Sequence, residues 1–290
     1  MFKLFYVFVW TFTLLPLKVL YLFSDIFYLL IYYVLPYRKK LVRKNLTEAF
    51  PSKSVKEIEA IEKQYYRFFC DLFFETLSVM HMSENELMRR MHYSNIDVIL
   101  EEYKKGNSVF LMTAHYGNWE WGISLSSFFP ADKPLYSIYQ KLSNKKFDAF
   151  MYNLRKTFKG EMLERNDLLR KIVQLKSENK PAMFGMISDQ APAYKSIHYW
   201  TNFLNHDTAT VSGTEQLAKK FDYPVYFAKV NRIKRGYYNC EFISLAQSPK
   251  QAPENEITER YMRLLEANIE SAPEYWLWSH NRWKHSPKID

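Results

Sequence analysis

The chain has 290 residues, of which 48% are hydrophobic and 18% aromatic, so it can bury one sizeable core, and an intrinsically disordered protein is excluded. Its formal net charge of +9 fits nucleic acid, anionic lipid headgroups or an acidic protein equally well and selects none of them. The two cysteines, Cys70 and Cys240, lie far apart without a second ligand pair at metal spacing, which argues against a disulfide framework and a zinc site.

The first 37 residues have the composition of a membrane segment. Residues 5–15 are almost wholly apolar, and residues 19–37 continue with Asp25 as the only formal charge. Because about 20 apolar residues span a bilayer, the second run predicts one tilted span or an interfacial helix, with a buried helix of a soluble domain as the alternative. The basic stretch "YRKKLVRK" follows in place of a cleavage site, so we expect a retained anchor, residues 1–37, before a cytoplasmic domain, residues 38–290.

Helical patterns dominate the next part of the chain. Ser54 and Glu57 stand at capping-box spacing before a long amphipathic helix that extends to about residue 80. A second capping signal at Ser83 and Glu86 starts a shorter helix, and residues 96–103 form another. The predicted apolar face of the long helix comprises Ile58, Ile61, Tyr65, Phe68, Phe69, Leu72, Phe73 and Leu77.

The pattern then changes to short apolar runs that predict strands. The runs are residues 109–112, 135–139, 182–187, 225–230 and 238–244, and a turn at Gly236 joins the last two. Helical patterns lie between several of them. This alternation predicts an α/β fold, with a mixed sheet flanked by helices on both faces in one domain.

The stretch "VFLMTAHYGNWEWG" places His115 just beyond the first predicted strand, where open α/β sheets bind ligands. Gly117 permits a tight turn, and a helix beginning near Asn118 would bring the carboxylate of Glu120 back to the imidazole N–H. In such a dyad the acid fixes the tautomer, while the other ring nitrogen takes a proton from a hydroxyl. From spacing alone, a capping histidine and an ordinary first-turn glutamate remain the alternative.

Other polar side chains follow predicted strands in the same way. Asp189 and Gln190 come after "AMFGMIS", Lys141 comes after "PLYSI", and Arg155 lies on the helix before Gly160, so we expect these side chains to converge on His115. Taken singly, strand-end caps and solvated charges are their alternatives.

Two further motifs suit an anion or a membrane boundary. Ser212, Gly213 and Thr214 near a helix amino terminus form a plausible anion cradle, with an ordinary cap as the alternative. The closing "PEYWLWSHNRWK" combines three tryptophans with Arg282 and other basic residues, which suits a wall between core and headgroups, although core packing explains the tryptophans equally well. The chain contains no dinucleotide, P-loop, HExxH or GxSxG motif, and no nucleic-acid-binding signature.

Together these segments resemble the lipid A biosynthesis lauroyl/myristoyl acyltransferase family of the lysophospholipid acyltransferase superfamily. The resemblance runs over nearly the whole chain, through "VRKNLTEAFP", "TAHYGNWEW", "SDQAP", "TATVSGTEQLAKKFDYPV" and "PEYWLWSHNRWK". It implies a glycerolipid-acyltransferase-like fold after a membrane anchor, at the cytoplasmic face of the inner membrane. The implied reaction transfers a fatty acyl chain from acyl carrier protein to a lipid A precursor, without cofactor or metal.

The resemblance assigns the catalytic pair to His115 and Glu120. Many relatives carry Tyr-Arg where this chain has Tyr139 and Gln140, so a substrate-anion contact there is either absent or moved to Lys141. An alternative acceptor is a lysophospholipid, an aminolipid or a phosphatidylinositol mannoside, and a different class is a non-catalytic protein bound to an anionic membrane or nucleic acid. We expect substrate contacts from Asn118, Lys141, Arg155, Asp189, Gln190, Ser212, Gly213, Thr214 and Arg282.

Overall fold

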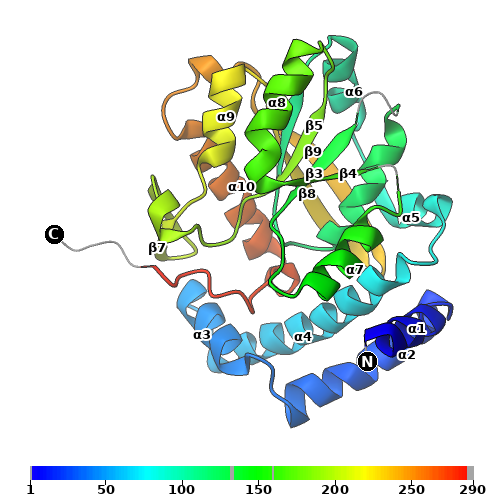
Figure 1. The fold of residues 1–290 in the computed structure, drawn as a ribbon. Coiled ribbons are helices and arrows are strands. Elements are labelled where there is room, and N and C mark those ends of the chain that lie inside the picture. The colour runs from blue at the N-terminus through cyan, green and yellow to red at the C-terminus, as the bar shows by residue number, and fades with distance from the viewer. Residues whose placement is uncertain (1, 131–133, 159, 286–290) are drawn as a thin grey trace.

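A seven-stranded mixed sheet forms the centre of the computed structural model, which describes residues 2–130, 134–158 and 160–285. The strand order is β1-β9-β8-β2-β5-β3-β4, and all neighbours are parallel except the β8–β9 hairpin (Figure 1). The strands are β1 (Met91–Tyr93), β2 (Val109–Thr113), β3 (Leu135–Tyr139), β4 (Glu161–Glu164), β5 (Met183–Ile187), β8 (Val225–Lys234) and β9 (Tyr237–Ala246).

The five predicted strands are confirmed, as is the turn at Gly236, where φ is 73°. The edge strands β1 and β4 were not predicted, because three or four residues give too little hydrophobic periodicity. A separate antiparallel pair, β6 (Trp200–Phe203) and β7 (His206–Ala209), was also not predicted.

Both faces of the sheet are covered by helices, as predicted for an α/β fold. Along β2, Phe110 and Met112 contribute to one core, whereas Val109 and Leu111 contribute to the other, as expected for a strand buried on both sides. The first core lies under α8 (Leu168–Ser177), α9 (Gly213–Phe221) and α10 (Glu256–Ser271). The second lies under α5 (Glu84–Arg90), α6 (Asp97–Lys104), the 3-10 helix η2 (Trp119–Phe128) and α7 (Lys145–Arg155).

Helix α4 (Val55–Ser78) contributes buried side chains to both cores. Its predicted capping box is present, because the Ser54 hydroxyl accepts from the Glu57 N–H and the Glu57 carboxylate accepts from the Ser54 N–H at 2.8 Å. The predicted apolar face is largely buried, but Phe73 is wrongly placed there, since 46% of it is exposed. Phe73 instead packs against Phe27 of the amino-terminal helices.

The amino-terminal segment forms helices that lie along the lower edge of the molecule in Figure 1, beside α4. They are α1 (Phe2–Phe12), α2 (Leu17–Leu29) and the π-helical continuation η1 (Leu30–Val34), and α3 (Lys39–Ala49) then leads into α4. Within the described ranges, one helix, Leu17–Val34, is long and apolar enough to cross a membrane, and 33% of that window is buried. The short 3-10 segments are η3 (Arg165–Asp167), η4 (Tyr194–Ser196), η5 (Pro249–Gln251) and η6 (Pro273–Tyr275).

Candidate active site

His115 and Asp189 meet where two neighbouring parallel strands end. Thr113 at the end of β2 pairs with Ile187 at the end of β5, and each polar residue follows its strand by two positions. The His115 Nδ1 lies 2.7 Å from Asp189 Oδ1, and the His115 backbone N–H donates to Asp189 Oδ2 at 3.0 Å. The indole N–H of Trp276 donates to the same Oδ2 at 2.8 Å. These three contacts fix the carboxylate against the imidazole.

The surroundings of Asp189 favour its ionised form. Burial acts to raise the pKa of this carboxyl, which is 2% exposed, but the attraction to His115 and the hydrogen bonds from His115 and Trp276 lower the pKa below 3.8 overall. A carboxylate only accepts hydrogen bonds, so the imidazole proton belongs on Nδ1. The other ring nitrogen, Nε2, lies 3.2 Å from the side-chain amide nitrogen of Gln190, which can donate to it. Nε2 is therefore the basic nitrogen of the ring.

Glu120 does not contact the imidazole, which corrects the predicted geometry of the dyad. Its carboxylate accepts two hydrogen bonds from Arg155, from Nε at 2.8 Å and from Nη2 at 2.6 Å, and a third from Trp119 Nε1 at 3.2 Å. The segment after the turn is the 3-10 helix η2 rather than an α-helix, and the Glu120 side chain reaches toward α7. The carboxylate against His115 is that of Asp189, which was predicted as a substrate contact.

Glu120 is nevertheless connected to His115 through the ring of Trp119. The Trp119 indole packs edge-on against the His115 ring, with ring centroids 5.0 Å apart. On the other side of Glu120, burial acts to lower the pKa of Arg155, but the hydrogen bonds and charge of Glu120 raise it overall. The guanidinium is therefore a permanent cation held in a bidentate pair with Glu120.

The turn between His115 and Glu120 is fixed by Gly117 and Asn118. Gly117 has φ of 60°, and a Cβ added there would lie 2.8 Å from Cγ1 of Val230, so this position requires glycine. The Asn118 side chain donates to Glu75 Oε2 at 2.7 Å and accepts from the Trp121 N–H at 3.0 Å. Since both ends of its amide are bonded within the protein, Asn118 holds the turn, and contact with substrate stays a prediction.

The structure does not gather all the predicted residues around His115. Lys141 follows β3, two strands away from β2, and pairs with Glu164 at 2.5 Å. Ser212 is the N-cap residue of α9, which begins with Gly213 and Thr214, and the side chains of Ser212 and Thr214 are buried. Their binding of an anion therefore stays a prediction.

Arg282 is a buried cation beside the Asp189 carboxylate. It is 2% exposed, and its three guanidinium nitrogens have no hydrogen-bond partner among the described residues. Burial lowers the pKa of Arg282 to about 10, an effect that attraction to Asp189 and Tyr261 only partly offsets. The guanidinium thus adds positive potential near Asp189, which favours the ionised carboxylate. Its contact with substrate stays a prediction.

His280 supports the loop that carries Asp189 and Gln190. Its Nε2 accepts from the Ala191 N–H at 3.2 Å, which requires that nitrogen to be unprotonated. Burial lowers the pKa of His280 from 6.5 to about 4. His280 and Trp276 were predicted only as parts of a wall between core and headgroups, with core packing as the alternative for the tryptophan, and no role was predicted for Glu75.

The depressed pKa of His280 predicts an acid-labile fold. The unfolded chain binds a proton at His280 near pH 6.5, whereas the folded chain binds it only near pH 4, so stability falls as the pH drops through this window. We expect His280→Gln, whose carbonyl can still accept from Ala191, to flatten that part of the curve. Urea unfolding midpoints of both proteins between pH 7 and about pH 4 check this. Parallel curves would remove His280 as the cause.

Comparison with known proteins provides a family assignment. A family model described as "Bacterial lipid A biosynthesis acyltransferase" matches residues 1–285. The chain is also similar to "Lipid A biosynthesis palmitoleoyltransferase" of Escherichia coli (strain K12), with 22% identity over 252 residues, which is 86% of this chain and 80% of the relative. A "Lipid A biosynthesis acyltransferase" of Shigella flexneri matches with the same identity and coverage.

Proposed function

The chain belongs to the bacterial lipid A biosynthesis acyltransferase family, and we propose that it transfers a fatty acyl chain from an acyl carrier protein thioester to a hydroxyl of a lipid A precursor. The observation that carries the proposal is the pairing of His115 with Asp189 at adjacent strand ends, with Nε2 as the basic nitrogen. Membership of an acyltransferase family sets aside the non-catalytic interpretation of the basic, aromatic surface.

In the proposed mechanism His115 acts as general base. The acceptor hydroxyl first replaces the Gln190 amide as the group hydrogen-bonded to His115 Nε2. Nε2 then removes the proton from that hydroxyl as its oxygen attacks the thioester carbonyl. Asp189 stabilises the imidazolium that forms. The tetrahedral intermediate then collapses, the C–S bond breaks, and the imidazolium returns the proton to the thiolate. An ester and a free thiol are the products.

We assign Arg155 and Glu120 to the electrostatic part of the reaction. The thioester oxygen gains negative charge in the intermediate, and a fixed guanidinium stabilises such charge without reorganising. Glu120 holds Arg155 by two hydrogen bonds and positions Trp119 against His115. Glu120 is thus a positioning residue in this mechanism, and the proposed catalytic residues are His115 and Arg155.

The proposed location is the cytoplasmic face of the inner membrane. Leu17–Val34 supplies an apolar helix of sufficient length, and Arg38, Lys39 and Lys40 come four to six residues after its end. Positive charge beside an apolar segment favours the cytoplasmic side, where anionic lipids are present. This placement brings the site to the side where acyl carrier protein resides.

An assay with purified protein tests donor and acceptor together. We expect transfer from acyl carrier protein thioester to a lipid A precursor, and a donor KM that rises strongly with salt, because a chain of charge +9 attracts an acidic donor. Mass spectrometry identifies the product. Equal turnover with acyl coenzyme A, together with a donor KM that does not depend on salt, would contradict acyl carrier protein as the donor. Acylation of a lysophospholipid but not of the lipid A precursor would identify the lysophospholipid as the acceptor instead.

A further inference from the structure

Among the residues that the structure describes, the one helix long and apolar enough to cross a membrane, Leu17–Val34, lies along the catalytic domain. Three hydrogen bonds join it to α4: from Tyr21 to Glu75 at 2.7 Å, from Ser24 to Asp71 at 2.8 Å and from Tyr32 to Glu62 at 2.9 Å. As the residue numbers rise along α2 and η1, they fall along α4, so the two run antiparallel. If α2 crossed the bilayer and kept these hydrogen bonds, α4 would therefore have to enter the bilayer as well.

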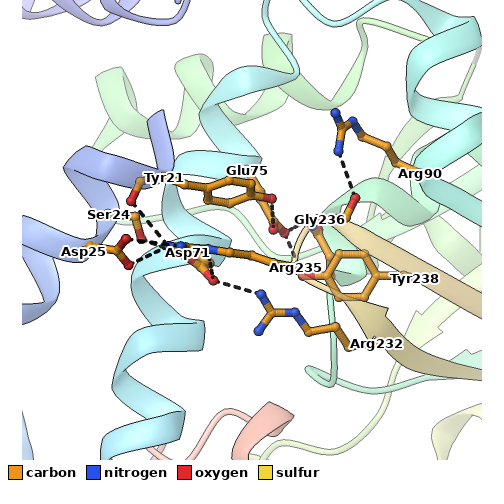
Figure 2. Close-up of polar contacts among 11 residues, drawn as sticks. Tyr21, Ser24, Asp25, Asp71, Glu75, Arg90, Arg232, Arg235, Gly236 and Tyr238 are labelled. Atoms are coloured by element: carbon orange, nitrogen blue, oxygen red, sulfur yellow. Dashed lines mark hydrogen bonds and ion pairs between the residues drawn. The ribbon is translucent and has the colours of Figure 1, made fainter. Parts of the chain in front are cut away.

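Helix α4 is not a membrane helix, because it carries charges along the same stretch. Asp71 and Glu75 are buried between α2, α4 and the β8–β9 hairpin, as Figure 2 shows. Asp71 accepts from Arg232 at 2.9 Å and from Arg235 at 2.6 Å, and Arg235 also pairs with Asp25 of α2 at 2.7 Å. Withdrawing α2 into lipid would separate Asp25 from its cation and leave Asp71 with one partner fewer, which is unfavourable for a buried charge.

Glu75 connects α2 to the turn at Asn118 that follows His115. Besides Tyr21, it accepts from Tyr238 of β9 and from Asn118, each at 2.7 Å. Helix α1 makes a second link, because Val9 packs with Leu77 of α4 and Phe150 of α7, the helix that carries Arg155. The amino-terminal helices are thus part of the scaffold that orients the site.

The outward side of these helices is apolar. Val7, Phe8, Leu22, Ile26, Leu29 and Tyr33, which we call the docking face, are 53–64% exposed. The α2 members recur at the spacing of one helical stripe, while Leu20, Tyr21, Ser24 and Tyr28 on the opposite stripe are buried. An apolar stripe this large on a soluble surface requires a partner.

Charge around the docking face identifies that partner. Exposed Lys18 lies in the first turn of α2, and Arg38, Lys40 and Lys44 follow its continuation. An apolar stripe flanked by basic residues is the pattern of a helix that lies in the interface of an anionic membrane.

We propose that α1 and α2 do not cross the bilayer but lie in its plane, pinned to the catalytic domain through Asp71 and Glu75, with the docking face in the acyl layer of an anionic membrane. This inference deepens the proposed function, since it sets how the site meets a membrane-borne acceptor, and it refines the predicted anchor, residues 1–37, into a surface helix pair.

Depth measurement by spin labelling distinguishes the two arrangements. Single cysteines at Leu22, Ile26, Leu29 and Tyr33 are labelled in the full chain, reconstituted with vesicles of equal parts phosphatidylglycerol and phosphatidylethanolamine. Lying in the plane, the four labels should have nearly equal depths just below the headgroups. A spanning helix would spread them over roughly 15 Å, from the rise of 1.5 Å per residue.

Two controls make the result decisive. The chain without added cysteines should take up no label, because Cys70 and Cys240 are buried, and a label at Leu169, which is 44% exposed on α8, should remain in water. Depths that change steadily along α2, or labels as water-accessible as that at Leu169, would overturn the proposal. If the four labels have equal depths but the protein shows no acyl transfer, the in-plane arrangement of α1 and α2 is supported and the proposed function is refuted.

Discussion

Asp189→Asn is expected to lower kcat/KM for acyl transfer by about 10²–10⁴ while leaving the fold intact. The asparagine amide can present an N–H to Nδ1 of His115, which moves the ring proton to Nε2 and removes the base. The other contacts of this position, from the His115 backbone and Trp276, can be retained by the amide oxygen. Initial rates over a range of acceptor concentrations provide the measurement.

His115→Ala is expected to cause a loss of the same order, on the order of 10²–10⁴, and combining it with Asp189→Asn should add little. Non-additivity follows because the two residues act as one unit. Asp207→Asn, at an exposed position of β7, is the matched control and should retain full activity. Near-normal turnover of folded Asp189→Asn would refute the His115–Asp189 pair as the base.

The second large effect concerns the ion pair between Arg155 and Glu120. Arg155→Met is expected to reduce kcat by about 10²–10³ with a small change in acceptor KM, because the guanidinium acts on charge that forms in the intermediate. Glu120→Gln should reduce kcat less, and the double variant should resemble Arg155→Met alone. A double-mutant cycle measures this coupling.

The control for that cycle is an exposed ion pair between an arginine and a carboxylate. Arg170 pairs with Asp167 at 2.9 Å, and its side chain is 82% exposed. Arg170→Met should leave kcat unchanged, since exposed pairs contribute little. If Glu120→Gln and Arg155→Met were additive, Glu120 would have a role independent of Arg155, and direct action of its carboxylate in catalysis would regain support.

Local sequence patterns predicted the strands and helices that position the site. Apolar runs specified β2 and β5, and the Ser54–Glu57 spacing specified the start of α4. His115 and Asp189 could each be placed after a strand, because parallel strands end at the same edge of a sheet. Their direct pairing depends on strand order, which places β2 next to β5, and strand order is a property of the whole fold.

Side-chain direction and long-range partners could not be predicted in the same way. The contact of Glu120 with Arg155 depends on η2 being a 3-10 helix and on where α7 packs. The role of Trp276 depends on the bridge between Tyr116 and Trp276, residues far apart in sequence. The composition of residues 19–37 predicted a membrane-active segment, but the acidic partners of its polar side chains, Asp71, Glu75 and Glu62, lie on α4 and could not be matched to it from the sequence.

The central claim is that this chain acylates a lipid A precursor with His115 as base, and the mass of lipid A in cells tests it most directly. Lipid A should lose one acyl chain when the gene is deleted. The intact gene should restore that chain, and a gene encoding His115→Ala, expressed at the same level, should not. Lipid A of unchanged mass in the deletion strain, or full restoration by His115→Ala, would contradict the account.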